Sequence, residues 1–86
     1  MFKWIKRRIA MRRFRKQIIC CIKNKPKGIH LHSASYYYTS TTEKEKLISY
    51  VERILRHRRV KYTRPDETLF KLDNKNSVHL FYIEVI

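Results

Sequence analysis

Basic residues dominate the first 27 positions of the chain, which carry eleven Lys or Arg side chains and no Asp or Glu. The rest of the chain holds ten basic and seven acidic residues, so this segment supplies most of the formal net charge of +14. A surface with this charge attracts polyanions, and its self-repulsion carries a cost when the protein is free. The segment therefore predicts nucleic-acid binding as the leading function.

The length and hydrophobicity of the chain indicate one small folded domain. Its 86 residues are 43% apolar and 13% aromatic, which is too hydrophobic for a wholly disordered chain. A domain of this size has a thin margin of stability, to which dimerisation or ligand binding can add. We expect a single domain over residues 1–86, in which residues 1–27 form a strongly basic helix that acts as an arm.

The basic segment is predicted to be helical from Phe2 to about Asn24, because neither Pro nor Gly occurs before Pro26 and Gly28. At about 100° per residue, one apolar stripe contains Trp4, Met11, Phe14, Ile18, Cys21 and Ile22. The broad opposite face collects Arg8, Arg12, Arg15, Lys16 and Lys23. Such a helix fits contact with RNA or DNA phosphates through arginine forks, binding to a membrane surface, or a basic face that is merely solvated.

Residues 29–39 alternate with a period of two, which predicts a β-strand. One face would carry Ile29, Leu31, Ser33, Ser35 and Tyr37, and the other would carry His30, His32, Ala34, Tyr36 and Tyr38. The second face, with two histidines and two tyrosines, has the ring types on which unpaired bases stack. The alternative interpretation is that these rings cover a sheet edge or a dimer interface.

A second helix is predicted from a hydroxyl cap near Ser40 to about His57. Ser40 with Glu43, or equally Thr42 with Glu45, fits a capping box. The inner stripe would contain Leu47, Val51, Ile54 and Leu55. Basic residues collect at and after the end of this helix, namely Arg53, Arg56, Arg58, Arg59, Lys61 and Arg64. This second positive patch fits phosphate contacts or simple complementation of the helix dipole.

Three strand-like runs follow, at Val60–Thr63, Thr68–Leu72 and Val78–Val85. A turn over residues 64–67 should separate the first two, and residues 73–76 should close a hairpin between the last two. The last run is apolar on both faces, so we expect a central strand covered above and below, sandwiched between the two helices. The predicted fold is α+β, in the order α-β-α-β-β-β, with an antiparallel-rich sheet packed with two helices.

Catalytic and metal-binding chemistry finds little support in the sequence. His30 and His32 could bind one metal ion together with His79. The same pair could cleave RNA together with His57 or Lys61. The spacing of these residues in the sequence does not require either site. Gly28 is the only glycine, so a glycine-rich nucleotide-phosphate loop is excluded. We expect no enzymatic activity, no metal and no cofactor.

The two cysteines and the hydropathy bear on the compartment. Cys20 and Cys21 are neighbours, a separation that seldom meets disulfide geometry, and we expect free thiols in a reducing environment. No uninterrupted apolar run reaches the roughly 18 residues of a membrane span. Arginines also interrupt any secretory signal. A cytoplasmic location is predicted.

The style of the sequence resembles the small basic early proteins of T-even-type phages. The likeness lies in the length, in the scarcity of glycine and in the Lys, Ile, Tyr and Asn usage of IKNKPKGIH, YYYTSTTEKEK and KLDNKNSV. That group includes RNA-binding, antitoxin-like inhibitors of host defences such as the ToxIN toxin–antitoxin system. The resemblance implies RNA binding, a homodimer and action on a host ribonuclease toxin complex, and it assigns no residue.

The leading hypothesis is a non-enzymatic protein that binds nucleic acid, RNA in preference to DNA, mainly through phosphates. The candidate contact residues are Lys6, Arg7, Arg8, Arg12, Arg13, Arg15, Lys16, Arg56, Arg58, Arg59, Tyr36 and Tyr38. The alternatives are a protein-interaction module or inhibitor that docks on an acidic partner surface, and a basic amphipathic protein of the membrane surface. A homodimer is expected because a long apolar last strand with unpaired edges invites pairing.

Overall fold

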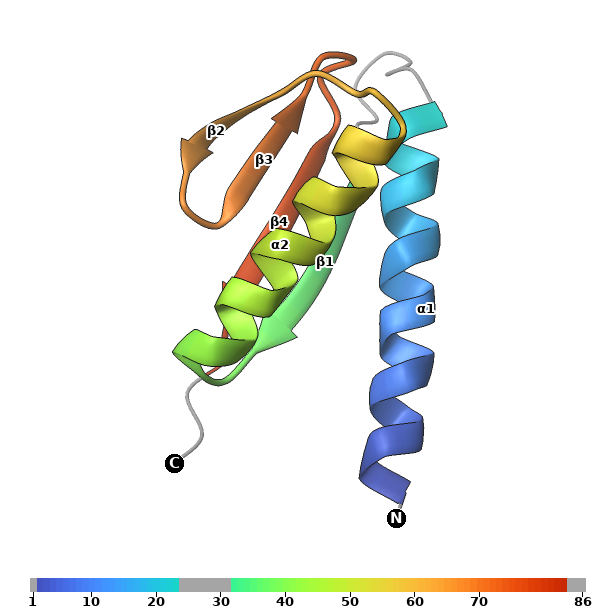
Figure 1. The fold of residues 1–86 in the computed structure, drawn as a ribbon, viewed down its shortest axis with the longest axis vertical. Coiled ribbons are helices and arrows are strands. Elements are labelled where there is room, and N and C mark those ends of the chain that lie inside the picture. The colour runs from blue at the N-terminus through green and yellow to red at the C-terminus, as the bar shows by residue number, and fades with distance from the viewer. Residues whose placement is uncertain (1, 24–31, 84–86) are drawn as a thin grey trace.

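The computed structural model describes residues 2–23 and 32–83, with side chains from residue 5 onward. It contains two helices and four strands in the predicted order (Figure 1). The elements are α1 (Phe2–Lys23), β1 (Ser33–Tyr38), α2 (Thr41–His57), β2 (Tyr62–Asp66), β3 (Leu69–Leu72) and β4 (Ser77–Tyr82). The α+β class is therefore confirmed. The predicted beginning of the first strand, residues 29–31, lies outside the described residues.

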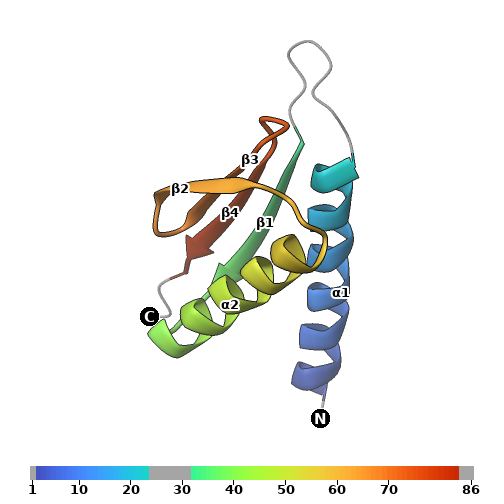
Figure 2. The ribbon, with the colours of Figure 1, turned by 45° about the horizontal axis from the view of Figure 1, so that its top comes forward.

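The four strands form one mixed sheet in the order β1-β4-β3-β2. β1 pairs in parallel with β4, while β4 pairs antiparallel with β3 and β3 antiparallel with β2. The strand nearest the N-terminus and the last strand of the chain thus lie side by side. α2 lies across one face of this sheet, and α1 runs alongside β1 (Figures 1 and 2).

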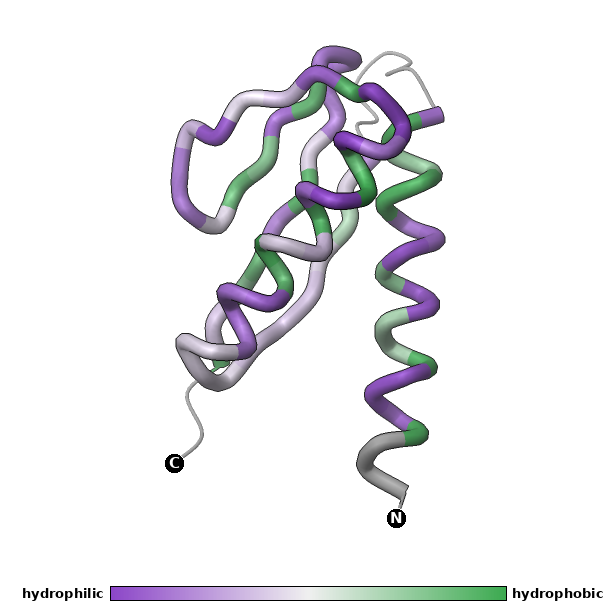
Figure 3. The backbone as a smooth tube through the Cα atoms, in the orientation of Figure 1, coloured by the Kyte–Doolittle hydropathy of each residue, from purple (hydrophilic) through white to green (hydrophobic). Residues whose placement is uncertain are grey.

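The core lies between the helices and a single face of the sheet. α1 contributes Phe14, Ile18 and Cys21, and α2 contributes Leu47, Val51 and Leu55. The sheet contributes Ala34, Tyr38, Phe70, Leu72, Val78 and Leu80, which all share one face. The apolar stripes predicted for both helices are confirmed in their central residues, while Met11, Ile22 and Ile54 are only partly buried and pack against the core. The side chain of Trp4 lies outside the described residues. Figure 3 shows how apolar and polar residues alternate along α1.

The predicted sandwich around the last strand is wrong. β4 is central in the sheet, as its two apolar faces indicated, because β1 and β3 flank it. Both helices, however, pack on the face that carries Val78 and Leu80. On the opposite face Phe81 is 42% exposed, and no described element covers it. The extra apolar side chains of β4 therefore form a surface rather than a second core.

β2 extends further than predicted and includes the segment expected to be a turn. The reversal falls at Glu67 and Thr68, and Pro65 lies inside the strand. Proline lacks the N–H that a ladder needs, so it is tolerated on an edge strand. The pairing of β2 with β3 is irregular between Thr63 and Asp66, which accommodates Pro65 without loss of the hairpin.

The start of α2 is fixed by the first of the two predicted caps. Ser40 has extended dihedral angles, and its hydroxyl accepts a hydrogen bond from the Glu43 N–H at 3.2 Å. The Glu43 carboxylate reaches back to accept from the N–H and the hydroxyl of Thr39, each at 3.2 Å. The acidic side chain also faces the positive end of the helix dipole. The capping box thus uses Ser40 and Glu43, but the Glu43 carboxylate contacts Thr39 instead of the backbone N–H of the N-cap residue Ser40.

α1 protects the edge strand β1. The Ser35 N–H donates to the Gln17 side-chain oxygen at 3.3 Å, so this edge donor is satisfied by the helix. Unpaired edges are sites of aggregation, and covering them with a helix is one solution. β4 is paired on both sides, so the unpaired apolar edge that led us to expect a homodimer is not present in it. The homodimer itself stays a prediction.

The β3–β4 turn anchors the last turn of α1. The Cys21 carbonyl oxygen accepts from the side-chain amide of Asn74 at 2.6 Å and from that of Asn76 at 2.8 Å. Asn76 is fully buried, and its side-chain oxygen accepts from the His32 N–H at 3.3 Å. The last carbonyl groups of a helix have no N–H donors within the helix. Here the donors come from two asparagine side chains that lie 53 and 55 residues further along the chain.

The two adjacent cysteines are free thiols in different surroundings. Cys20 is exposed, and Cys21 is buried against the sheet. Burial, with a smaller contribution from Cys20, raises the pKa of Cys21 to about 11. A raised pKa means that the reactive thiolate of Cys21 is scarce near neutral pH.

Alkylation should therefore separate the two thiols. At about pH 8, iodoacetamide is expected to modify Cys20 quickly and Cys21 slowly, because a pKa near 11 leaves roughly a thousandth of Cys21 as thiolate. Peptide mapping by mass spectrometry measures both rates, and urea-unfolded protein serves as the control in which the rates converge. Equal rates in the folded protein would contradict the burial of Cys21.

Candidate nucleic-acid interface

The cations of α1 are solvent-exposed and have no acid on their own helix. The side chains of residues 5–9, 12, 13, 15 and 16 are all exposed. Within the described residues, Arg12, Arg13 and Arg15 form no ion pair, because Glu67 pairs with Lys44 and Glu52 pairs with Arg56 and Arg64. A guanidinium without a carboxylate partner keeps its whole donor fork for an external anion. The helix therefore presents unneutralised charge.

One flank of α1 joins the end of α2. Arg15 lines a pocket of about 350 Å³ with Tyr50, Arg53, Ile54, His57 and Arg58. A neighbouring pocket is lined by Arg7, Arg8, Met11, Arg12, Arg15 and Tyr50. The two helices thus bring several cations together around Tyr50. Arg58, one of the predicted contact residues, therefore lies in the same pocket as Arg15 of the basic helix.

The other flank of α1 faces the sheet edge. Lys6 and Arg13 line a groove of about 510 Å³ between α1 and β1. Gln17, Ser35 and Tyr37 also line this groove, so it leads from the helix cations to the outer side of β1. Because the flanks differ, the basic helix presents two cationic surfaces, one toward α2 and one toward the uncovered face of the sheet.

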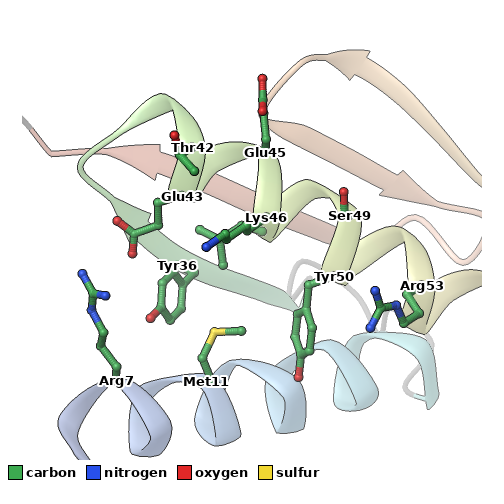
Figure 4. Close-up of a pocket in the computed structure, with 11 residues that line it drawn as sticks. Arg7, Met11, Tyr36, Thr42, Glu43, Glu45, Lys46, Ser49, Tyr50 and Arg53 are labelled. Atoms are coloured by element: carbon green, nitrogen blue, oxygen red, sulfur yellow. The ribbon is translucent and has the colours of Figure 1, made fainter. Parts of the chain in front are cut away.

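A larger pocket of about 600 Å³ separates the N-terminal half of α1 from α2 (Figure 4). Met11, Tyr36 and Tyr50 form its apolar wall, and Arg7 points toward Glu43 across it. Burial raises the pKa of Tyr36, with Glu43 adding to the rise and Arg7 opposing it. Glu43 and Glu45 share the lining with Arg7, Lys46 and Arg53, so the charges around this pocket are mixed, and its apolar wall suits an apolar group.

The remaining predicted cations are distributed unevenly. Arg56 is engaged in a 3.0 Å ion pair with Glu52, which also pairs with Arg64 at 3.2 Å. Arg64 also lies over the Phe70 ring, with its guanidinium carbon 4.9 Å from the ring centroid. Arg59 and Lys16 are exposed, but none of the pockets described above includes them. The structure thus groups Arg15 and Arg58 and leaves these others outside.

The prediction that Tyr36 and Tyr38 present rings for base stacking is wrong in its choice of face. Tyr38 is only 5% exposed and belongs to the core, and its ring contacts Tyr82. Tyr36 packs on Phe14 with a centroid distance of 5.1 Å. The helices cover the face that carries Ala34, so both tyrosines point inward. His30 lies outside the described residues.

The uncovered face carries aromatic residues that were not among the predicted contacts. Tyr37 and Phe81 are cross-strand neighbours, with ring centroids 5.3 Å apart and planes at 28°. His79 lies two residues before Phe81, with centroids 5.8 Å apart. The available signal was Ala34: a small apolar residue flanked by two serines marks its own face as the buried one, which leaves Tyr37 outside.

In residues 2–23 and 32–83, no group of three His, Cys, Asp or Glu side chains could hold a metal ion. Neither described helix combines the length and the apolar character that crossing a bilayer requires.

The fold and its surfaces define a small α+β domain with a two-sided basic helix and one bare sheet face. No family model, curated protein or solved structure matches this chain.

Proposed function

We propose that the protein is a non-enzymatic nucleic-acid-binding protein that favours RNA over DNA and binds mainly through phosphates. The observation that carries this proposal is the row of exposed cations on α1, which have no acid on their helix and are continued by Arg53 and Arg58 of α2. Planar guanidinium groups suit phosphate oxygens, and contacts of this kind position a protein without reading sequence.

The preference for RNA rests on the arginine-rich helix and on exposed aromatic rings. Duplex RNA offers its backbone across a wide, shallow groove, while unpaired RNA offers bases to rings. A cytoplasmic location, expected from the two adjacent cysteines and the hydropathy, is part of the proposal. Action against a host toxin complex is also part of it and is implied by the resemblance to phage early proteins. Direct binding measurements come first.

The binding should depend steeply on salt. For six engaged phosphates, log Kd is expected to change with log salt with a slope of magnitude about 4 on single strands and about 5.5 on duplex DNA. Fluorescence anisotropy with matched single-stranded RNA, duplex RNA and duplex DNA across a salt series measures this slope. A slope of magnitude below about 2 would contradict phosphate-dominated binding. Equal affinity for the three nucleic acids would contradict the preference for RNA and would indicate general binding of polyanions.

A second candidate function, a protein-interaction module, is favoured by one observation. Ile5 and Ile9 are 41% and 47% exposed on α1, and Ile9 lines the groove between α1 and β1. A helix with exposed apolar and basic side chains can anchor in the groove of an acidic partner. Co-purification separates the candidates: RNA retained by the protein gives absorbance at 260 nm that ribonuclease removes, whereas a bound protein survives ribonuclease.

A further inference from the structure

The uncovered face of the sheet carries an ordered row of rings. Tyr37 of β1 and Phe81 of β4 are directly opposite in the parallel register, and His79 follows along β4. Tyr37 is 55% exposed and Phe81 is 42% exposed. The mutual contacts hold the rings at small interplanar angles, 28° and 21°, so they form a continuous shelf rather than three independent side chains.

The charge around this shelf is positive. On one side, Lys6 and Arg13 line the groove that ends at Tyr37. On the other side, Lys71 of β3 is opposite Ser77 in the register, on the same face as His79. Among the described strand residues the only acid is Asp66, on the far edge strand, where its carboxylate accepts from the Glu67 N–H at 2.7 Å. The shelf therefore matches an aromatic, negatively charged ligand.

We propose that this face binds single-stranded nucleic acid, with unpaired bases stacked on Tyr37 and Phe81 and the adjoining phosphates held by Lys6 and Arg13. The inference rests on the proposed function and narrows its ligand class to strands with unpaired bases. Every base has a π-face, so stacking of this kind is tolerant of sequence. Phosphate binding and base stacking act together here because the groove places Lys6 and Arg13 beside Tyr37, the first ring of the shelf.

Charge argues against a second copy of the chain as the occupant. Each copy carries a formal net charge of +14, and face-to-face pairing would bring Lys71 and the groove cations of both copies together. Like charges at an interface oppose association. Nucleic acid covers the same rings and neutralises the same cations.

The test compares a short single-stranded RNA with an abasic ribose-phosphate oligomer of the same length and charge. Wild-type protein should bind the base-bearing strand more tightly. Tyr37→Ala and Phe81→Ala should each weaken that binding on the order of tenfold, as expected for loss of one stacked base, and leave affinity for the abasic oligomer unchanged. Tyr37→Phe keeps the ring and should retain wild-type affinity. Tyr82→Ala is the matched control, because Tyr82 is 59% exposed but its ring contacts Tyr38 of the core face.

The outcomes distinguish this inference from the proposed function. Equal affinity of wild-type protein for the base-bearing and abasic oligomers would overturn the stacking shelf and leave phosphate binding standing. Absence of binding to both would overturn both. A dimer of wild-type protein that Phe81→Ala converts to monomer in analytical ultracentrifugation would assign the face to self-association and overturn the inference. Circular dichroism verifies that each variant is folded.

Discussion

Replacing Arg12, Arg13 and Arg15 together with glutamate is expected to weaken RNA binding by at least a hundredfold near 0.1 M salt. Each phosphate contact on a single strand contributes about 0.7 to the salt slope, so at 0.1 M salt each is worth roughly fivefold in affinity. Three lost contacts give about a hundredfold, and the added negative charges repel the strand further. The slope should also fall in magnitude by about 2.

The fold should survive this triple substitution, because all three side chains are exposed and form no ion pair among the described residues. The matched control is Lys46→Glu, Lys61→Glu and Lys75→Glu, which changes the net charge equally at exposed positions outside α1. The control should lose far less affinity. Equal losses in the two triple variants would show that binding follows net charge alone, and would remove the assignment to α1.

Asn76→Ala is expected to destabilise the protein by about 2–4 kcal/mol, because it removes a fully buried amide and leaves a cavity. The amide donates to the Cys21 carbonyl at 2.8 Å, and its oxygen accepts from the His32 N–H at 3.3 Å. Chemical denaturation followed by circular dichroism measures the change. In a domain of this size the melting temperature should fall by roughly 10 °C or more.

Asn76→Asp tests whether the donated hydrogen bond causes the effect. The aspartate has nearly the same shape and keeps an acceptor for His32, but it turns a carboxylate toward the Cys21 carbonyl oxygen. Stability should therefore fall, and fall further as the pH rises through the ionisation of the new carboxyl group, since the protonated carboxyl can donate to the Cys21 carbonyl oxygen and the buried anion cannot. A variant as stable as the wild type at every pH would contradict the role assigned to the amide.

Local patterns predicted the parts of the fold that depend on neighbouring residues. The helix stripes followed from the 3.6-residue period, and Phe14, Ile18 and Leu55 are indeed buried. The β3–β4 hairpin followed from the Asp and Asn residues of its turn, although the residue that takes a positive φ there, 71°, is Lys75. Such features are decided within a few residues, so the sequence displays them directly.

The choice of sheet face could not be read with the same certainty. In SASYYY, small and aromatic residues occur on both faces, and tyrosine suits either a core or a wet surface. Tertiary packing decides: Phe14 and Tyr50 occupy the side on which Tyr36 lies. The sequence analysis therefore selected Tyr36 and Tyr38 where the structure exposes Tyr37.

The cation groupings and the aromatic shelf also depend on long-range pairing. Tyr37 and Phe81 meet only because β1 pairs in parallel with β4 across the whole intervening chain. Arg15 meets Arg53 and Arg58 only because both helices pack on one face. These residues are far apart in the sequence, and the periodic patterns of helices and strands do not indicate that they meet in the fold.

The central position of β4 has a consequence for how the protein is made. β1 is synthesised early, but its pairing partner is the last of the four strands, so the sheet cannot close until Tyr82 has left the ribosome. Until then, three consecutive tyrosines and an unpaired strand edge are open to other chains. Contacts between distant segments also slow folding. We expect a nascent chain that collapses late and in one step, with its cationic helix free throughout translation.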